Sequence, residues 1–237
     1  MSNLLRVENV SKRFGGLQAV DGVSLQLQGP SVIGLIGPNG SGKTTLLGII
    51  AGTQGPTQGQ VTLDGVVISG RGAHRTVHTG IARTFQTTRL LASWTLREAM
   101  RLASNEGPRG TRMAASARDI ASRLRLDAQL DIPCQRLTSA QQRLAMIAVA
   151  LSTAPRILLL DEPAVGMDVG ETLELATAIR QLRDELGISI IVVDHNMHFL
   201  MPLAQTVIVM ASGRVLATGT PAQIRANESV IASYLGS

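Results

Sequence analysis

The chain has 237 residues, 44% of them hydrophobic and 16% charged, which suits one large domain or one domain that carries a smaller inserted lobe. Its net charge is +5, but the basic residues are scattered and aromatic residues make up only 2% of the chain, so no nucleic-acid partner is expected. The single cysteine, Cys134, excludes an internal disulfide, and the apolar runs are too short to span a bilayer.

Strand patterns dominate the first third of the chain. Five short stretches carry them, at residues 4–10, 20–27, 31–36, 61–63 and 66–68. The first two alternate in part between apolar and polar side chains, which predicts a pair of half-exposed strands, and the third is a continuous apolar run typical of a buried strand. A helical pattern starts at Gly42 and stops near Gly52. Asp64 and Gly65 separate the last two stretches, which predicts a hairpin.

Residues 88–150 change character, because Ala, Leu and Arg recur there with helical spacing. We expect a small α-helical lobe here, inserted into a core formed by residues 1–87 and 151–237. Beyond the lobe, an amphipathic helix at residues 171–186 ends at Gly187. Strand patterns return at residues 156–160, 188–193, 207–210 and 215–218. Alternating helices and continuous apolar strands predict an α/β fold whose mainly parallel sheet is covered on both faces.

A glycine-rich loop follows the strand predicted at residues 31–36. It reads Gly37, Pro38, Asn39, Gly40, Ser41, Gly42, Lys43 and Thr44, followed by Thr45. Every fixed position of the Walker A pattern G-x-x-x-x-G-K-[ST] is present. The glycines let successive backbone N–H groups point into one anion-sized hollow, and the following helix directs its positive end at the same place. The loop therefore predicts ATP binding, with Lys43 at the β- and γ-phosphates and the Thr44 hydroxyl on Mg²⁺.

Two acidic residues, Asp161 and Glu162, follow the apolar run at residues 157–160. Taken alone, such a pair also suits the first turn of a helix. Ligands bind at the carboxyl ends of strands in open α/β sheets, and the phosphate loop is present, so we favour a role in the ATP site. Asp161 is then expected to hold Mg²⁺ through water, opposite Thr44, and Glu162 to polarise the attacking water.

These residues together resemble the ABC ATPase family, and the resemblance covers essentially the whole chain. It implies a P-loop NTPase core, an N-terminal antiparallel β subdomain and an inserted α-helical lobe. It also implies that Gln86 is a Mg²⁺ and water contact that senses a transmembrane partner, and that His195 is the switch histidine at the γ-phosphate. Asp168 matches the D-loop that crosses to a second subunit. Phe14 falls where the family stacks an aromatic ring on adenine, with core packing as the alternative for that ring.

The family signature, usually Leu-Ser-Gly-Gly-Gln, is matched poorly. The corresponding residues are Leu137, Thr138, Ser139, Ala140 and Gln141. In the family this segment begins a helix and closes over the γ-phosphate held by the other subunit, so the side chain of Ala140 is expected to crowd that phosphate or restrict the backbone. Thr138 still offers the hydroxyl of the usual serine, and the helix start with its amide donors is expected to survive. The resemblance therefore implies that binding persists while turnover falls at the composite site completed by this signature.

A narrower resemblance is to the branched-chain amino acid importer ATPases. It rests on residues 14–24, 80–86, 161–164, 194–197, 219–225 and 230–236. It implies an ATPase that powers separate transmembrane permease subunits and works with a second ABC ATPase subunit and an extracytoplasmic solute-binding protein. The poor signature favours a heterodimer over a homodimer. The first residues do not form a signal peptide, so we expect a cytoplasmic protein that is peripheral on the inner face of the cell membrane.

Two alternatives stay open. One is an ABC-type ATPase with reduced or no turnover that serves as a nucleotide-sensing partner in a heterodimer. The poor signature speaks for this alternative, and the intact Glu162 and His195 speak against it. The other is a non-transport ABC protein that acts on nucleic acid or ribosomes. Such proteins tend to have fused cassettes, long coiled-coil inserts or zinc-binding insertions, and the sequence shows no pattern of these kinds.

Overall fold

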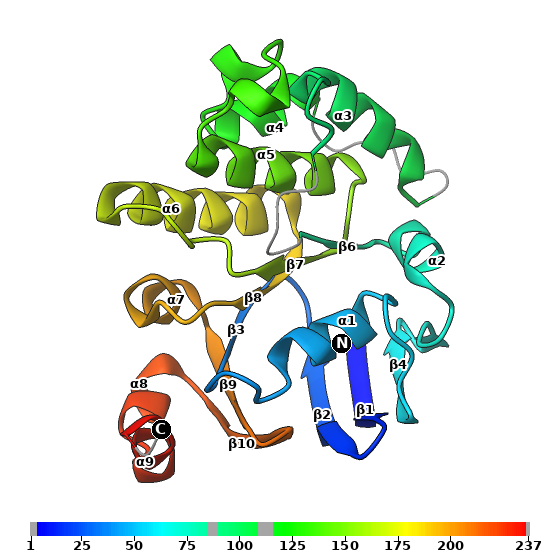
Figure 1. Cartoon of the computed structure of the whole chain (residues 1–237), viewed down its shortest axis with the longest axis vertical. Helices are drawn as coiled ribbons and strands as arrows, with labels where there is room; N and C mark the ends of the chain where they lie inside the picture. Colours follow the sequence, from blue (N-terminus) through cyan, green and yellow to red (C-terminus); the bar gives the residue numbers. More distant parts are fainter. Residues whose placement is uncertain (1–3, 85–89, 109–115, 236–237) are drawn as a thin grey trace.

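The computed structural model describes residues 4–84, 90–108 and 116–235, which form two β-sheets and a set of helices (Figure 1). The smaller sheet is antiparallel, with strand order β2-β1-β4-β5. Its strands are β1 (Leu5–Phe14), β2 (Leu17–Leu27), β4 (Gln58–Leu63) and β5 (Val66–Val67). The pairing of β1 with β2 and the β4–β5 hairpin confirm the strands predicted for this part of the chain.

The larger sheet has strand order β10-β9-β3-β8-β7-β6, and its neighbours are parallel except for β9 and β10. Its strands are β3 (Val32–Ile36), β6 (Ile81–Arg83), β7 (Ile157–Asp161), β8 (Ser189–Val193), β9 (Thr206–Ala211) and β10 (Arg214–Gly219). Every residue of β3, β7 and β8 is buried. Strands that are covered on both faces have no solvent-facing positions, which explains why these three read as nearly continuous apolar runs.

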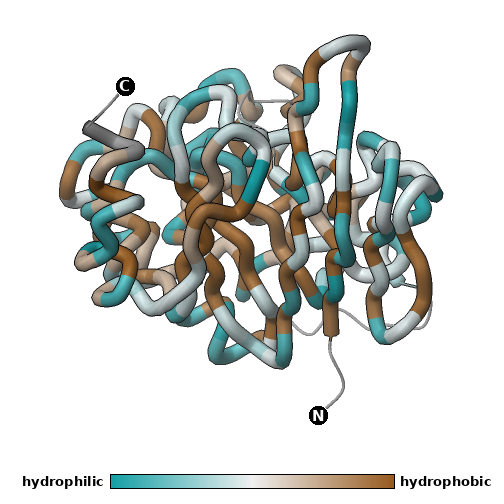
Figure 2. The backbone as a smooth tube through the Cα atoms, turned by 90° about the horizontal axis from the view of Figure 1, so that it is seen from below, coloured by the Kyte–Doolittle hydropathy of each residue, from teal (hydrophilic) through white to brown (hydrophobic). Residues whose placement is uncertain are grey.

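Successive residues of β7 show how the larger sheet divides the interior. Ile157 and Leu159 pack with α1 (Lys43–Ile50) and the smaller sheet, whereas Leu158 and Leu160 pack with helices on the opposite face, because alternate side chains of a strand point to opposite faces. The helices on that opposite face are α5 (Ser139–Ser152), α6 (Val169–Leu186) and α7 (Met197–Leu203). Figure 2 shows hydrophobic stretches of the backbone running through the middle of the molecule. The predicted mainly parallel sheet with two covered faces is thus confirmed.

The helices α3, α4 and α5 gather at one end of the molecule (Figure 1) and form the predicted α-helical lobe. The lobe contains α3 (Leu96–Ala103), α4 (Ala117–Arg123), and the 3-10 helices η1 (Ser104–Glu106), η2 (Asp127–Gln129) and η3 (Cys134–Arg136). The three α-helices among the lobe's described residues begin with capping boxes, whose N-cap residues are Thr95, Ser116 and Thr138. Within the described ranges, no helix combines the length and the apolar character needed to cross a membrane.

Several short elements have no counterpart among the predictions. They are α2 (Ala73–His78), β6, α7, α8 (Pro221–Arg225) and α9 (Glu228–Leu235). None exceeds eight residues, so a hydrophobic period has too few repeats to stand out. The helix α6 begins at Val169, earlier than predicted, because Asp168 caps its first turn through the N–H of Glu171.

Candidate functional site

The glycine-rich loop lies between β3 and α1, at the carboxyl end of β3. Gly37 (φ 148°) and Gly42 (φ 98°) adopt backbone conformations that favour glycine. A Cβ at Gly37 would overlap the carbonyl oxygen of Met210 on β9, and one at Gly42 would overlap the carbonyl oxygen of Ala19 on β2. Close contact with strands of both sheets therefore fixes the path of the loop, and only glycine fits at these two positions.

Lys43, the first residue of α1, folds back over this loop. Its Nζ donates hydrogen bonds to the carbonyl oxygens of Gly37 (2.8 Å) and Pro38 (2.9 Å) and to the hydroxyl of Ser41 (3.4 Å). Burial lowers the pKa of the ammonium, and two nearby carboxylates act in the opposite direction. The loop thus holds a half-buried cation where the motif predicts phosphate groups.

Those carboxylates belong to Glu162 and Asp161 at the end of β7. Asp161 is 2% exposed, and its Oδ2 accepts a hydrogen bond of 2.7 Å from the guanidinium of Arg83 on β6. Its Oδ1 is buried and accepts no hydrogen bond from any residue that the structure describes. A buried carboxylate oxygen is unfavourable until another group satisfies it, and carboxylate and hydroxyl oxygens suit Mg²⁺. Asp161 and the exposed Thr44 therefore offer a donor set that fits a hard cation.

Glu162 has φ 50°, a left-handed conformation that is uncommon for a residue with a side chain. A backbone hydrogen bond of 2.7 Å from its N–H to the carbonyl of Val193, the last residue of β8, holds it there. Strain of this kind persists only where the surrounding structure enforces it, and it concentrates at functional sites. His195 follows shortly after β8, and its Nδ1 lies 3.9 Å from Glu162 Oε1. Pairing of neighbouring strands thus brings together two residues that are far apart in the sequence.

Asp194 fixes the two turns that carry this pair. Its Oδ1 accepts a hydrogen bond from the N–H of Asn196 (2.8 Å), and its Oδ2 accepts one from the N–H of Ala164 (3.2 Å). Burial raises the pKa of this carboxyl, and the two backbone donors oppose the shift. Asp194 therefore ties the turn after Glu162 to the turn that presents His195.

Two residues of the site, Arg83 and Asp194, were not predicted from the sequence. The position of Arg83 depends on the pairing of β6 with β7, which sets it opposite Leu159, and β6 is too short to predict. Asp194 carried a weak signal, because it stands at the end of a buried strand directly before His195, as Asp161 stands before Glu162.

Three other predicted residues have separate positions. Phe14 ends β1 and is 46% exposed, which excludes the alternative of core packing, and Lys12 Nζ lies 5.1 Å from the centre of its ring. Asp168 is the N-cap of α6, where its Oδ1 accepts a hydrogen bond of 2.8 Å from the N–H of Glu171. Gln86 lies outside the described residues.

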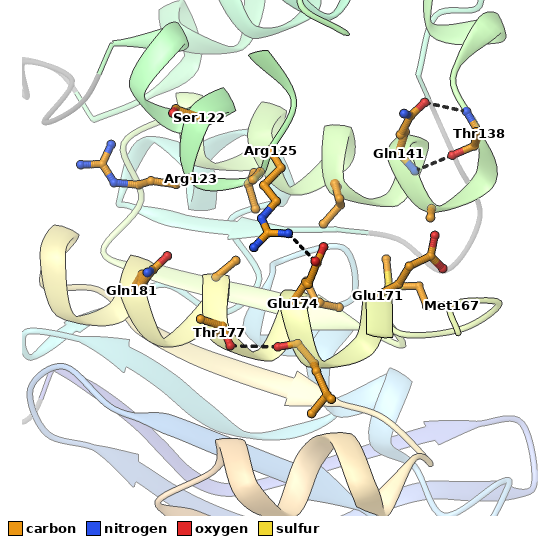
Figure 3. A pocket seen from close by; sticks show the side chains of 16 residues that line it. Ser122, Arg123, Arg125, Thr138, Gln141, Met167, Glu171, Glu174, Thr177 and Gln181 are labelled. Atoms are coloured by element: carbon orange, nitrogen blue, oxygen red, sulfur yellow. Dashed lines mark hydrogen bonds and ion pairs between the residues drawn. The ribbon is translucent and has the colours of Figure 1, made fainter. Parts of the chain in front are cut away.

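The signature position forms the start of α5. The hydroxyl of Thr138 accepts a hydrogen bond from the N–H of Gln141 (3.2 Å), and Gln141 Oε1 accepts one from the N–H of Thr138 (3.0 Å). Figure 3 shows both bonds beside a cavity of about 640 Å³, and Ala140 also lines this cavity. Two other residues that line the cavity, Arg125 just after α4 and Glu174 on α6, form an ion pair. The helix start is therefore present and capped despite the poor match.

Two family models match the chain. One, described as ABC transporter, matches residues 20–165. The other, described as branched-chain amino acid ATP-binding cassette transporter, matches residues 214–237. The first covers more than half of the chain and includes the glycine-rich loop and both carboxylates at the end of β7.

Known proteins resemble the chain over its whole length. The high-affinity branched-chain amino acid transport ATP-binding protein BraF of Pseudomonas aeruginosa is 36% identical, with 98% of each chain covered. The corresponding protein LivG of Escherichia coli is 35% identical, again with 98% of each chain covered. The crystal structure of the ADP conformation of MJ1267, an ATP-binding cassette of an ABC transporter, is 28% identical, with a TM-score of 0.89 and 100% of both chains covered. The likeness therefore extends to both sequence and fold.

Proposed function

The chain belongs to the ABC transporter family of ATP-binding proteins, and we propose that it hydrolyses ATP for an importer of branched-chain amino acids or related small polar solutes. Similarity over the full length to BraF and LivG, which carry that transport role in their names, supports the cargo class. The match of residues 214–237 to the branched-chain model supports it as well. The ATPase activity rests on one observation above all: Lys43, which is hydrogen-bonded over the phosphate loop, lies close enough to the carboxylates of Glu162 and Asp161 to interact with their charges.

ATP binds through the backbone N–H groups of residues 37–45, and Lys43 exchanges its bonds to the loop carbonyls for bonds to the β- and γ-phosphates. Mg²⁺ would be held by Thr44, by Gln86 and, through water, by Asp161, and the unsatisfied Oδ1 of Asp161 supports this assignment. The ion, when bound, neutralises charge on the phosphates. The exposed ring of Phe14 stacks on the adenine base.

Hydrolysis depends on the pair that Asp194 holds in place. Glu162 polarises the attacking water, and His195 contacts the γ-phosphate. The backbone of Glu162 is held in a strained conformation by its hydrogen bond to Val193, so the turn that carries the carboxylate is in place before the reaction. Arg83 balances the buried charge of Asp161 while no nucleotide is present.

The active unit consists of two ABC ATPase subunits arranged head to tail, with ATP between the phosphate loop of one and the signature of the other. Nucleotide binding closes the pair, hydrolysis opens it, and motion of the helical lobe acts on the permease subunits. Asp168 contributes the crossing D-loop. The departure at Ala140 favours a heterodimer, in which this chain's phosphate loop faces a regular signature. The assembly lies on the cytoplasmic face of the cell membrane and receives its cargo from an extracytoplasmic solute-binding protein.

The double substitution Ser139→Gly/Ala140→Gly is expected to raise the ATPase activity of the assembled complex. Neither residue has a positive φ, so glycine is not required by the backbone at these positions, and the change removes two side chains from the start of the helix that is proposed to close over the partner's nucleotide. Glycine costs up to about 1 kcal/mol per residue in a helix relative to alanine, so thermal stability should fall while activity rises. Steady-state phosphate release and a melting curve measure the two effects. Unchanged activity would mean that this signature is adapted as it stands.

Purification from native membranes tests the transport role. The tagged full chain is isolated in detergent, co-purifying proteins are identified by mass spectrometry, and the complex is assayed for ATPase activity with a branched-chain amino acid and its binding protein. We expect permease subunits, a second ABC ATPase subunit and stimulated phosphate release. Ribosomes or nucleic acid in place of a permease would overturn the transport role. A complex that binds ATP without releasing phosphate would favour the alternative of a nucleotide-sensing subunit. The poor match of the signature segment is the observation that supports this alternative.

A further inference from the structure

Three potential metal ligands converge outside the nucleotide site. His74 and His78 stand four residues apart on α2, so both imidazoles project from the same face of the helix. Glu106, the last residue of η1, faces them from the end of the helical lobe. Its Oε2 lies 3.3 Å from His74 Nε2 and 3.8 Å from His78 Nε2, and the three ligand atoms all lie within 4.8 Å of one another.

The spacing of these atoms approaches that of a tetrahedral metal site. Zinc binds imidazole nitrogen and carboxylate oxygen at about 2.0–2.2 Å, so two ligand atoms of a tetrahedral site lie about 3.3 Å apart. The separation of Glu106 Oε2 from His74 Nε2 is 3.3 Å and that from His78 Nε2 is 3.8 Å, and no two of the three ligand atoms are more than 4.8 Å apart, so side-chain rotation has to close the remaining gaps when a metal binds. The rings of His74 and His78 already meet edge to face, with centroids 4.4 Å apart.

The tautomer of His78 supports a ligand role. Its Nδ1 lies 3.3 Å from the carbonyl oxygen of Gly107, and a carbonyl oxygen only accepts hydrogen bonds, so Nδ1 carries the proton. In the neutral ring this leaves a lone pair on Nε2, the nitrogen that faces Glu106. Histidines that bind metals usually donate their other N–H to a carbonyl or carboxylate in this way, which orients the ring and raises its basicity.

Tight packing fixes the backbones on both sides of the cluster. A Cβ at Gly107 would overlap the carbonyl oxygen of Thr153, so the segment after Glu106 lies directly against the end of α5. A Cβ at Gly52 would overlap the hydroxyl of Thr76, so α2 lies directly against the turn after α1. The ligands therefore project from two anchored segments, one on the core and one on the lobe, which reduces the ordering that metal binding requires.

We propose that His74, His78 and Glu106 bind a transition-metal ion of the Zn²⁺ class, with water as the fourth ligand. Two imidazoles with one carboxylate favour Zn²⁺, Co²⁺ or Ni²⁺ over Mg²⁺ or Ca²⁺, which prefer all-oxygen sites. The side chains of His74 and Glu106 are 74% and 47% exposed, which leaves the ion accessible to solvent. The bound ion links α2 to the end of the helical lobe, and it is separate from the Mg²⁺ that accompanies ATP.

Titration of the full-length, nucleotide-free protein with Co²⁺ and Zn²⁺ tests the site. We expect the visible absorption bands of low-symmetry Co²⁺, one equivalent of Zn²⁺ by calorimetry, and a rise in melting temperature with Zn²⁺. Zn²⁺ affinity should fall by about 10- to 100-fold or more in each of the variants His74→Ala, His78→Ala and Glu106→Gln. Loss of a residue that only supports a metal ligand already lowers affinity by about this factor, so loss of a ligand should cost at least as much. All three side chains are partly exposed, so these variants are expected to fold, and circular dichroism checks this.

Two control variants test whether Zn²⁺ binds to other histidine or carboxylate side chains of the protein instead. His198→Ala removes an exposed histidine on α7 and should leave Zn²⁺ affinity unchanged. Asp161→Asn removes the carboxylate assigned to Mg²⁺ and should also leave it unchanged. Absence of saturable Zn²⁺ binding, or equal affinity in the wild type and the His78→Ala and Glu106→Gln variants, would overturn the proposal. The readouts do not involve ATP hydrolysis, so their failure is distinguishable from a failure of the transport role.

Discussion

Replacing Lys43 by alanine is expected to weaken ATP binding by about two to four orders of magnitude. The Nζ of Lys43 lies over the loop and donates to the carbonyl oxygens of Gly37 and Pro38 while no phosphate is present. With ATP bound, we expect two charge-assisted hydrogen bonds to phosphate oxygens in their place, each contributing about 1.5–3 kcal/mol. Because 1.4 kcal/mol corresponds to a tenfold change in affinity, the loss of both bonds gives the stated range.

Calorimetric titration with MgATP measures this loss, and the sequence offers a matched control. Arg225 is an exposed cation on α8, in an element to which no role in the ATP site is assigned. Arg225→Ala should leave the affinity within a few-fold of the wild type. Micromolar binding retained in Lys43→Ala would exclude the phosphate-loop assignment. A melting curve checks that Lys43→Ala is folded, which we expect because its hydrogen-bond partners belong to a partly exposed surface loop.

The fold was largely predictable because its sheet is buried on both faces. Residues 157–160 are apolar at every position and residues 188–193 at every position except Ser189, a pattern typical of strands covered from two sides, and both stretches lie in central strands. The hairpin at Asp64 and Gly65 was equally predictable, since its turn residues favour a positive φ and both adopt one. Periodicity and turn chemistry are local properties, and these elements depend mainly on them.

The elements and contacts that escaped prediction depend on tertiary neighbours. The strand β6 covers three residues, and it is defined by its pairing with β7, which comes much later in the sequence. Arg83 enters the site through that pairing alone. Local sequence patterns did mark three other residues of the site. The Walker A pattern contains Lys43, and Asp161 and Glu162 follow directly after an apolar run. No local pattern marks the strained φ of Glu162, because a hydrogen bond to the neighbouring β8 holds it.

The substitution Glu162→Gln is expected to lower ATP hydrolysis by about 10²- to 10⁴-fold, the usual contribution of a positioned general base. Glutamine has nearly the same shape as glutamate, so the hydrogen bond from residue 162 N–H to Val193 and the conformation of the turn should persist. The change removes the negative charge that polarises water. ATP binding through Lys43 should remain, and ATP-bound dimers should therefore accumulate, because the step that opens them is blocked.

Phosphate release and size-exclusion chromatography of the complex with MgATP together distinguish this outcome from simple damage. Loss of turnover with retained ATP and a larger dimer fraction is the expected combination, whereas Lys43→Ala should lose turnover, nucleotide and dimer together. Glu228→Gln, at the exposed start of α9, makes the same chemical change away from the phosphate loop and should behave as wild type. Full turnover in Glu162→Gln would contradict the assigned role. The water would then have to be polarised by another group, and His195, whose Nδ1 lies 3.9 Å from Oε1 of this carboxylate, is a candidate to substitute next.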